Sequence, residues 1–522
     1  MLKNIRFICA FLAVFMLCSC SAGKSTDDPN VDKLKDGDLI VRENSNEINI
    51  SVSFFDTFNP IMTKSSSVAE FMKTICEPLF EYDERYNPIG VLAESYTVSD
   101  DGLTVSFDLK DANFHDGTKL LPEDVIYTVN MIKNNDTLYG DCVKYIKSIY
   151  SDEGGKVYIQ LSRPIVNFIG MLCFPIVKKD TPQTVDANYM PNGTGAYKYY
   201  GKQNAGKVIF SANADWHGGE AGLKNIAVNI LKDDTTVAHA FDAGEIDVLA
   251  SAFAASENST PRGEYTTNEY TSNALTFLGI NNYNKKLSGK LTRQAIELLC
   301  DRKKIIDVEV YSKGVPVRIP INPSAWFFPE MSEKSSDYET VASILATDGW
   351  TKTENGYFRS SDSEELTLKI LVNADNPEKI RIAQNIAESL NNFGIPASVL
   401  QKSFDEYKSY ISSKDYELFV GEVNIDSSLD PSFLTASSGN YFGYQSDDME
   451  NTLKEMAKTS DSTKMMDLSA QYADIFTDDM PFVPLFFRTQ NVIYNKHISG
   501  ISPPTFYHVY RNMQEWYVSQ TR

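Results

Sequence analysis

Apolar and polar residues between positions 87 and 130 follow a pattern that predicts a hairpin, a turn and a helix. In the second strand of the hairpin, apolar residues alternate with polar ones, as in a strand with one buried face; these are Leu103, Val105, Phe107 and Leu109. Gly102 supplies the positive φ that the tight turn before this strand needs. Pro122 suits the first helical position, and the helix then has one apolar face, made of Val125, Val129 and Ile132.

Strands and helices alternate in the pattern between positions 366 and 421. The predicted order is strand, helix, strand, helix, strand, over residues 366–372, 376–393, 397–400, 404–411 and 416–421. Connections of this length predict right-handed crossovers and a largely parallel sheet. Ligands of such sheets bind beyond the carboxyl ends of the strands. Here those ends are residues 373–375 and the loop 422–431.

The first nineteen residues have the pattern of an export signal. Lys3 and Arg6 precede an apolar run at 8–17 that is too short to span a bilayer. The run Leu17-Cys18-Ser19-Cys20 resembles a bacterial lipobox, which implies that Cys20 is lipidated and becomes the new N-terminus. A plain secretory signal is the alternative. Residues 20–44 are small, polar and charged, which predicts a flexible tether.

Length and charge narrow the class of protein. A chain of 522 residues is too long for one ordinary domain. Without Lys3 and Arg6, the chain has 47 basic and 70 acidic side chains, a net charge of −23. Nucleic-acid binding requires a basic surface, so this charge argues against it. We attribute the acidity to solubility.

Signatures of catalysis and of metal binding are missing from the sequence. None of the five histidines lies in an HExxH motif, and no GxSxG nucleophile motif is present. We expect His115 to be structural in its turn. The mature chain has four further cysteines with no metal-binding spacing: Cys76, Cys142, Cys173 and Cys300. They are interpreted as buried thiols, although export also permits a disulfide. We therefore predict no catalytic site, no metal site and no cofactor.

The order of several motifs points to a known family. The run LAESYTVSDDGLTVSFDLKDANFHDGTKLLPEDVIYTVN resembles the signature of the family 5 solute-binding proteins of ABC transporters, which include the large oligopeptide, dipeptide and nickel binders. Further segments resemble this family in the same order: SFFDTFNP, PNGTGAYKY, ILKDDTTVAHAFDAGEIDVLA and DDMPFVPLFFRTQNVIY. The resemblance implies an α/β, two-lobed periplasmic-binding-protein-like fold. Its lobes are joined by two crossing strands, and the N-terminal lobe carries an extra subdomain.

The resemblance also implies a division of the chain. The signal peptide covers residues 1–19 and the tether covers residues 20–44. The core of lobe I is expected from 45–75, 180–277 and 486–522, its extra subdomain from 76–179, and lobe II from 278–485. We expect the lobes to close about a hinge near residues 277–281 and 484–487.

The function that the resemblance implies is capture of extracellular oligopeptides or dipeptides between closing lobes, followed by delivery to an ABC permease. The protein would act as a monomer, held by its lipid at the outer face of the cell membrane. An extended peptide suits such a cleft, because its backbone groups give affinity independent of its side chains. A nickel chelate, an oligosaccharide or another solute is an alternative ligand. An exported hydrolase is the alternative of a different class.

One acidic residue is the main candidate for ligand recognition. Peptide binders of this family pair an Asp with the N-terminal ammonium of the ligand, in a Trp-x-x-Asp run before an Asp/Glu-Pro. The segment EVNIDSSLDPSF offers Asp426 before Asp430, without the tryptophan and with a spacing one residue longer. No Lys or Arg lies close in sequence, so we expect an unpaired carboxylate that can receive an ammonium. Capping of a turn is the alternative role.

Aromatic residues and one glycine-rich loop complete the candidate site. In lobe II the candidates are Trp326, Phe327, Phe328, Tyr441 and Tyr444. In lobe I they are Phe54, Phe55, Gly193, Thr194 and Gly195, chosen by family position. For every aromatic in these sets, packing in the core is the alternative to ligand contact.

Overall fold

The computed structural model describes residues 46–519, except 203–205, 251–263, 332–336 and 437–439. The predicted signal peptide and the whole of the predicted tether, including Cys20, lie outside the described residues. In the described part of the chain, no helix has both the length and the apolar character needed to cross a membrane.

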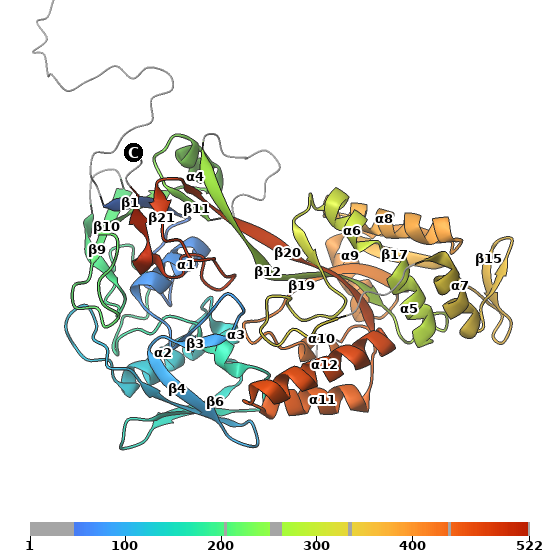
Figure 1. The fold of residues 1–522 in the computed structure, drawn as a ribbon, viewed down its shortest axis with the longest axis horizontal. Coiled ribbons are helices and arrows are strands. Elements are labelled where there is room, and N and C mark those ends of the chain that lie inside the picture. The colour runs from blue at the N-terminus through green and yellow to red at the C-terminus, as the bar shows by residue number, and fades with distance from the viewer. Residues whose placement is uncertain (1–45, 203–205, 251–263, 332–336, 437–439, 520–522) are drawn as a thin grey trace, which may run out of the picture. The chain divides into compact units, whose positions relative to one another are not determined.

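Two long strands carry the chain between two lobes (Figure 1). They are β12 (Tyr265–Ile280) and β20 (Phe482–Asn495), which pair antiparallel. Their sheet has the order β11-β20-β12-β19-β17-β18, with β13 also paired to β20. The other members are β11 (Val248–Ala250), β13 (Gly314–Pro316), β17 (Leu368–Asn373), β18 (Ala397–Lys402) and β19 (Leu418–Asn424). The predicted fold class, with two lobes joined by two crossing strands, is confirmed.

The pairing of the two crossing strands is interrupted near their middle. The register shifts between Thr271 and Leu275, and again between Thr276 and Phe277. The first shift lies just before the segment 277–281, and the second includes Leu485, inside the segment 484–487. Irregular pairing bends a strand locally. The hinge itself stays a prediction.

Lobe II contains the parallel strands β17, β18 and β19. The predicted helices between them are present as α8 (Pro377–Phe393) and α9 (Phe404–Ser412). Helix α8 begins where the Asn376 side chain accepts a hydrogen bond from the Lys379 amide, and it ends at Gly394, whose φ is 106°. An Asn cap and a left-handed Gly are standard helix boundaries, so the local sequence alone sets the limits of α8.

The remaining helices and strands of lobe II surround this sheet. The helices are α5 (Lys290–Leu299), α6 (Arg302–Lys304), η3 (Ile305–Glu309), α7 (Tyr338–Thr347), α10 (Ser432–Ala436), α11 (Asp447–Lys458) and α12 (Ser462–Asp479). A small antiparallel sheet is formed by β14 (Thr351–Thr353), β15 (Gly356–Arg359) and β16 (Glu364–Glu365).

Lobe I contains two four-stranded sheets. The first has the order β1-β10-β9-β8, in which β1 and β10 are parallel; its strands are β1 (Glu47–Ser53), β8 (Tyr197–Lys202), β9 (Lys207–Ala212) and β10 (Asn225–Leu231). Helices α1 (Ser66–Ile75) and α4 (Asp234–Asp242) contact this sheet. The second sheet is antiparallel, with the order β4-β5-β7-β6.

The second sheet contains the hairpin that the sequence predicts. Its strands are β4 (Ala93–Val98), β5 (Thr104–Leu109), β6 (Ile146–Ser151) and β7 (Val157–Leu161). Gly102 lies in the turn with a φ of 69°, and α2 (Pro122–Asn134) begins at the predicted proline. The hairpin, the turn and the helix are therefore confirmed. The short elements β2 (Phe80–Tyr82), β3 (Pro88–Gly90), α3 (Gly140–Val143), η1 (Phe168–Leu172), β21 (Ile498–Ser499), η4 (Met513–Glu515) and β22 (Tyr517–Val518) complete the lobe.

Buried apolar side chains form three large clusters in the described chain. One takes its members from residues 61–177, around the second sheet of lobe I. Another joins the first sheet of lobe I to the C-terminal segment 492–518. The largest comes almost wholly from 275–487, but it also includes Tyr82, Tyr86, Val166 and Tyr507 of lobe I. Those four residues therefore mark where the core of lobe II meets lobe I. The predicted domain boundaries stay a prediction.

The four cysteines of the described chain are free thiols. Cys76 and Cys300 are buried, and Cys142 and Cys173 are partly exposed. Burial raises the pKa of Cys142 to about 11 and that of Cys300 to about 12. At neutral pH these two side chains are therefore thiols rather than reactive thiolates.

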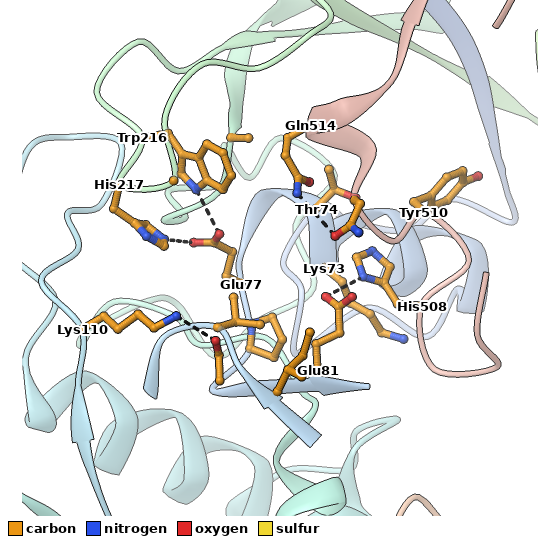
Figure 2. Close-up of a pocket in the computed structure, with 17 residues that line it drawn as sticks. Lys73, Thr74, Glu77, Glu81, Lys110, Trp216, His217, His508, Tyr510 and Gln514 are labelled. Atoms are coloured by element: carbon orange, nitrogen blue, oxygen red, sulfur yellow. Dashed lines mark hydrogen bonds and ion pairs between the residues drawn. The ribbon is translucent and has the colours of Figure 1, made fainter. Parts of the chain in front are cut away.

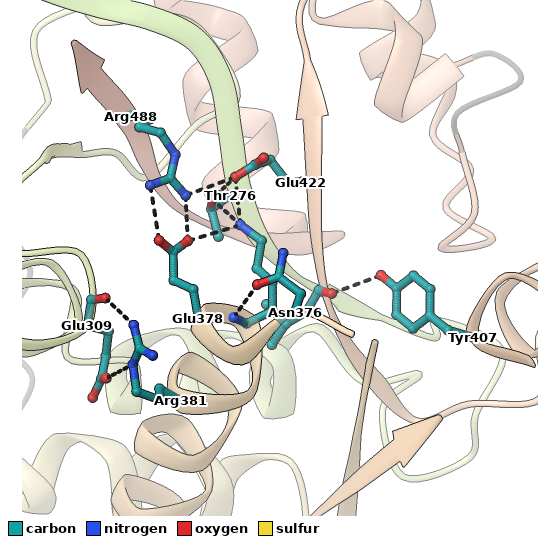
Figure 3. Close-up of polar contacts among 10 residues, drawn as sticks. Thr276, Glu309, Asn376, Glu378, Arg381, Tyr407, Glu422 and Arg488 are labelled. Atoms are coloured by element: carbon teal, nitrogen blue, oxygen red, sulfur yellow. Dashed lines mark hydrogen bonds and ion pairs between the residues drawn. The ribbon is translucent and has the colours of Figure 1, made fainter. Parts of the chain in front are cut away.

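A buried lysine, Lys379, connects the first turn of α8 to β12 and β19, beside the contacts of Glu378, Glu422 and Arg488 that Figure 3 shows. The Lys379 ammonium lies 2.6 Å from a Glu422 carboxylate oxygen on β19 and 3.1 Å from the Thr276 hydroxyl on β12. Arg488 on β20 contacts Glu378 at 2.5 Å and Glu422 at 3.3 Å. Burial by itself raises the pKa of Glu422, but the Lys379 and Arg488 cations outweigh it and hold that pKa at about 2.

We predict that Glu422→Gln destabilises the protein in a pH-dependent way. The substitution leaves the buried Lys379 ammonium without its closest anion. One third of the Glu422 side chain is exposed, so we expect a loss of only about 1–2 kcal/mol at pH 7. Because its folded pKa is depressed, the Glu422 contribution is present above the ordinary glutamate pKa of about 4.3 and is lost as the pH falls toward 2. Urea unfolding at pH 7 and pH 3 should show the difference from the wild type shrinking at pH 3.

Glu388→Gln on the same helix is the matched control. Glu388 pairs with Lys304 at 2.8 Å, but their side chains are 58% and 42% exposed. An exposed pair contributes about 0–1 kcal/mol, so this variant should behave almost as the wild type at both pH values. An equal loss in both variants, or a Glu422→Gln loss that does not change with pH, would contradict the prediction.

Candidate functional site

Three tyrosines of lobe I lie together where lobe I meets the core of lobe II. We call Tyr82, Tyr86 and Tyr507 the tyrosine cluster. The ring centroids lie 4.8 Å apart for Tyr82 and Tyr507, 5.6 Å for Tyr86 and Tyr507, and 5.7 Å for Tyr82 and Tyr86. Tyr82 ends β2, Tyr86 lies in the turn after it, and Tyr507 comes from the C-terminal segment. All three are buried members of the largest apolar cluster.

The tyrosine hydroxyls donate to main-chain carbonyl groups. Tyr82 donates to the Ser427 carbonyl of lobe II at 2.7 Å, and Tyr86 donates to the Thr271 carbonyl of β12 at 2.6 Å. The Tyr507 hydroxyl lies 3.4 Å from the Asp426 carbonyl. Burial raises the pKa of all three phenols, so each keeps its proton for donation.

Asparagine side chains near the tyrosine cluster also donate hydrogen bonds to main-chain carbonyl groups. Asn273, in the irregular part of β12, donates to the Ile425 carbonyl at 2.9 Å and also contacts the Tyr507 hydroxyl. Asn322 donates to the Ser272 carbonyl at 3.0 Å and to the Asn273 side-chain oxygen at 2.9 Å. Asn167 of lobe I donates to the Tyr82 hydroxyl at 2.7 Å and to the Ser428 carbonyl at 3.2 Å. The boundary between the lobes is therefore rich in amide and hydroxyl donors.

The loop after β19 brings Asp426 to this boundary. One carboxylate oxygen accepts hydrogen bonds from the Ser428 amide, at 3.1 Å, and from the Ser428 hydroxyl. The other lies 3.6 Å from the Lys144 ammonium of lobe I. The expectation of an unpaired carboxylate is therefore wrong, because folding brings Lys144 to it from a distant part of the chain. The alternative role, capping of a turn, is present in the structure.

A cavity of about 380 Å³ lies within lobe I (Figure 2). It is lined by α1, β2, β3, the loop after β9 and the C-terminal segment, and none of the described residues of lobe II lines it. Glu77 accepts from the Trp216 indole at 3.0 Å and lies 2.9 Å from the His217 imidazole. Glu81 lies 3.1 Å from His508 Nδ1. In the described part of the chain, no group of three or more His, Cys, Asp or Glu side chains is arranged to hold a metal ion.

Comparison with known families agrees with this architecture. The family described as "Bacterial extracellular solute-binding proteins, family 5 Middle" matches residues 87–445, well over half of the chain. The chain belongs to family 5 of the bacterial extracellular solute-binding proteins. The resemblance seen in the sequence is thereby confirmed.

Curated family 5 relatives cover nearly the whole chain at low identity. The oligopeptide-binding protein AppA of Bacillus subtilis is 21% identical, with 98% of this chain and 97% of AppA aligned. The nickel-binding protein NikA of Staphylococcus aureus is 22% identical, with 97% of this chain and 98% of NikA aligned.

Solved structures of other proteins share the fold. The unliganded open form of the murein tripeptide-binding protein MppA has a TM-score of 0.77 at 15% identity, and covers 91% of this chain and 97% of its own. Bacillus subtilis AppA in complex with a nonapeptide has a TM-score of 0.58 at 18% identity, and covers 91% of this chain and 99% of its own.

The aromatic candidates of lobe II have different environments in this family 5 protein. Phe327 and Tyr444 are buried in the core, and Tyr444 donates to Asp479 at 2.5 Å. Trp326 and Phe328 are partly buried and pack against that core. Tyr441 is 41% exposed. Packing accounts for Phe327 and Tyr444, and a ligand role for any of the five stays a prediction.

Among the candidates of lobe I, Phe55 and the glycine-rich loop have structural roles, whereas Phe54 is exposed. Phe54 is 64% exposed, whereas Phe55 packs against Phe58 with ring centroids 4.7 Å apart. A Cβ on Gly193 would lie 1.9 Å from the Ile75 carbonyl oxygen, and one on Gly195 would lie 2.3 Å from that of Thr74. The loop between them, with the buried Thr194, therefore needs glycine to approach the end of α1.

His115 holds the same loop in place. The Gly193 amide donates to His115 Nδ1 at 3.2 Å, and Nε2 lies 3.0 Å from the Gly195 carbonyl oxygen. Because Nδ1 accepts, we assign the ring proton to Nε2, which donates to Gly195. Burial lowers the pKa of His115, which favours this neutral form. The expectation that His115 is structural is confirmed.

The tyrosine cluster was missed by the sequence analysis. Tyr82 and Tyr86 lie in a short strand and its turn, and Tyr507 lies near the other end of the chain. No periodicity connects segments so far apart. A partial signal was the alternation in β2, where Phe80 and Tyr82 are buried and Glu81 is less so.

Proposed function

We propose that this protein is the substrate-binding component of an ABC importer, and that it captures extracellular peptides between its lobes and delivers them to a membrane permease. The observation that supports a peptide ligand is the set of hydroxyl and amide donors at the lobe boundary. Tyr82, Asn167 and Asn273 all donate to main-chain carbonyls of the loop 425–428. A peptide ligand carries the same carbonyl groups along its length, so the same donors can bind it whatever its side chains are.

The names of relatives leave other solutes open. Bacillus subtilis AppA and OppA are named as oligopeptide-binding proteins, whereas Staphylococcus aureus NikA is named as nickel-binding. A nickel chelate, an oligosaccharide or another solute is therefore the alternative ligand. We favour a peptide because the donors at the boundary match main-chain carbonyls. We also propose that the protein has no catalytic activity and returns its ligand unchanged, against the alternative of an exported hydrolase.

The proposed function predicts that peptides bind and are recovered intact. Calorimetric titration with an alanine tripeptide, pentapeptide and nonapeptide should give saturable binding to the wild type. At a hundredfold excess over its dissociation constant, a bound peptide should stabilise the fold by about 2.7 kcal/mol. Mass spectrometry of the mixture after incubation should show only the added peptide.

Other results would redirect the proposal. Failure of every peptide, together with a nickel chelate or a sugar found by native mass spectrometry of the purified protein, would refute a peptide ligand while keeping the transport role. Peptide fragments after incubation would support the hydrolase instead.

We also propose that Asp426 receives the N-terminal ammonium of the peptide. Its contact with Lys144 is 3.6 Å, which is too long for a hydrogen bond, and the two side chains are 30% and 36% exposed. Such a pair contributes about 0–1 kcal/mol. A ligand ammonium that makes a short, desolvated contact can therefore displace Lys144. Asp375 or Asp430 would be the next candidate for the same role.

Asp426→Asn should remove the discrimination between a free and a blocked N-terminus. The wild type should bind the free peptide more tightly than its N-acetylated form, because a buried ammonium needs an anion. The substitution should weaken binding of the free peptide by about 2–5 kcal/mol. Calorimetry with both peptides on both proteins measures this. Equal discrimination by wild type and variant would show that Asp426 serves only its turn.

We further propose that the exported chain is a monomer attached to the outer face of the cell membrane through a lipid on Cys20. This proposal rests on the lipobox-like run before Cys20 and on the polar residues that follow it. A polar tether has no membrane affinity of its own, whereas two or more acyl chains anchor stably. Cys20→Ala should therefore move the protein from the membrane fraction to the soluble exported fraction. Retention of the variant in the membrane fraction would contradict lipidation at Cys20.

A further inference from the structure

The tyrosine cluster and the cavity of lobe I lie on opposite sides of the same two segments, β2 and the C-terminal segment. Glu81 and Tyr82 are neighbours on β2, and Tyr507 and His508 are neighbours in the C-terminal segment. The Tyr82 and Tyr507 rings contact each other at the boundary with lobe II. Glu81 and His508 contact each other at 3.1 Å, and both line the cavity (Figure 2). One hydrogen-bonded side-chain contact therefore joins the two segments directly behind the ring contact.

The main chain on either side of His508 is fixed by α1. The Lys73 ammonium donates to the Tyr507 carbonyl, and the Val509 amide donates to Glu70 at 2.6 Å. Lys73 and Glu70 also pair with each other at 2.6 Å. These contacts hold the C-terminal segment to α1. They do not connect it to β2, the strand that carries Tyr82.

On the cavity side, the side chains of Glu81 and His508 connect the C-terminal segment to β2 itself. Two further contacts reach the turn after β2: Arg511 with Glu84 at 3.2 Å, and the Phe506 amide with the Tyr86 hydroxyl at 3.5 Å. The Glu81 and His508 side chains are only 14% and 8% exposed, so water screens their contact weakly. Because a cavity of about 380 Å³ lies beside these side chains, the two segments are not closely packed on this side. Close packing is what usually keeps core side chains in one place. On this side, the polar contact between Glu81 and His508 keeps the side chains in place instead.

We infer that Glu81 and His508 are a positioning pair that holds Tyr82 and Tyr507 in the arrangement needed to bind the ligand. This inference rests on the proposed function, because it takes the tyrosine cluster to contact the peptide. The Tyr82 hydroxyl meets a main-chain carbonyl while its ring lies against Tyr507, so a shift of either segment moves the donor. Groups that orient binding residues in this way have large effects on affinity without touching the ligand.

The same cavity offers a matched control pair. His217 lies 2.9 Å from Glu77, and their side chains are 17% and 10% exposed. The chain neighbours of these two residues are Trp216, Gly218, Cys76 and Pro78, none of which belongs to the tyrosine cluster. The control pair is therefore also a His and a Glu of similar burial beside the same cavity, but it has no adjacent tyrosine of the cluster, and Glu77 keeps the Trp216 indole as a second donor.

The experiment compares His508→Leu, His508→Asn and His217→Leu in calorimetric titrations with the alanine tripeptide, pentapeptide and nonapeptide. His508→Leu should weaken binding by about tenfold or more, because it removes the donor to Glu81. His508→Asn should stay within about threefold of the wild type, since its amide nitrogen can take the place of Nδ1 and donate to Glu81. His217→Leu should also stay within about threefold, although it should lower the urea-unfolding midpoint.

Several results would overturn the inference. An equal loss of affinity in His217→Leu would mean that any disturbance of the cavity loosens the site. An equal loss in His508→Asn and His508→Leu would mean that the hydrogen bond to Glu81 is not the cause. If His508→Leu fails to fold, Glu81→Met removes the same contact from the other side. If Glu81→Met then binds the peptides with wild-type affinity, the inference is wrong. If the wild type binds none of the three peptides, the proposed function fails, and this inference fails with it.

Discussion

The antiparallel pairing of β12 with β20 is the constraint on which the rest of the structure depends. These two strands carry the chain between the lobes, and they also supply the centre of the longest sheet. Where their register shifts, Ser272 and Asn273 leave the regular ladder. Buried main-chain groups must still find partners. Asn322 accordingly donates to the Ser272 carbonyl, and the Ile425 amide donates to the Asn273 carbonyl at 3.0 Å.

That requirement explains why the lobe boundary is polar although it lies within the largest apolar cluster. The irregular part of β12 brings the side chain of Asn273 to the loop after β19, and the tyrosine cluster covers the same region from lobe I. Hydroxyl and amide donors that bind main-chain carbonyl groups do not distinguish one side chain from another. In the proposed function, such donors suit peptide ligands of many sequences, and selectivity would come from charged side chains at the lobe boundary, among them Asp426 and Lys144.

Polar contacts of different strength support the two sides of this region. In lobe II, Lys379, Glu378, Glu422 and Arg488 form a network of short contacts between α8 and strands β12, β19 and β20 (Figure 3). In lobe I, behind the tyrosine cluster, a cavity takes the place of close packing, and single pairs such as Glu81 and His508 remain. The network joins four elements at once, whereas each pair of lobe I joins only two segments. Lobe I is therefore the side on which the loss of one contact has the more local effect.

The sequence by itself determined the features that depend on residues close together in the chain. The hairpin of β4 and β5 follows from alternation and from Gly102 in its turn, and α8 follows from Asn376 at one end and Gly394 at the other. The motifs that follow one another in family order along the chain identified the family and hence the two-lobed fold. A turn, a cap and a period of two or 3.6 residues are local requirements, so they can be seen in the sequence without knowing the fold.

The tertiary structure decided what depends on residues far apart. It brought Tyr507 to Tyr82 and Tyr86, and Lys144 to Asp426. It also placed Phe327 in the core and gave Gly193 its role against the end of α1. Nothing within a few residues of these positions signals such contacts. The two crossing strands and their shifted register determine which distant segments meet, and only the folded chain shows that register.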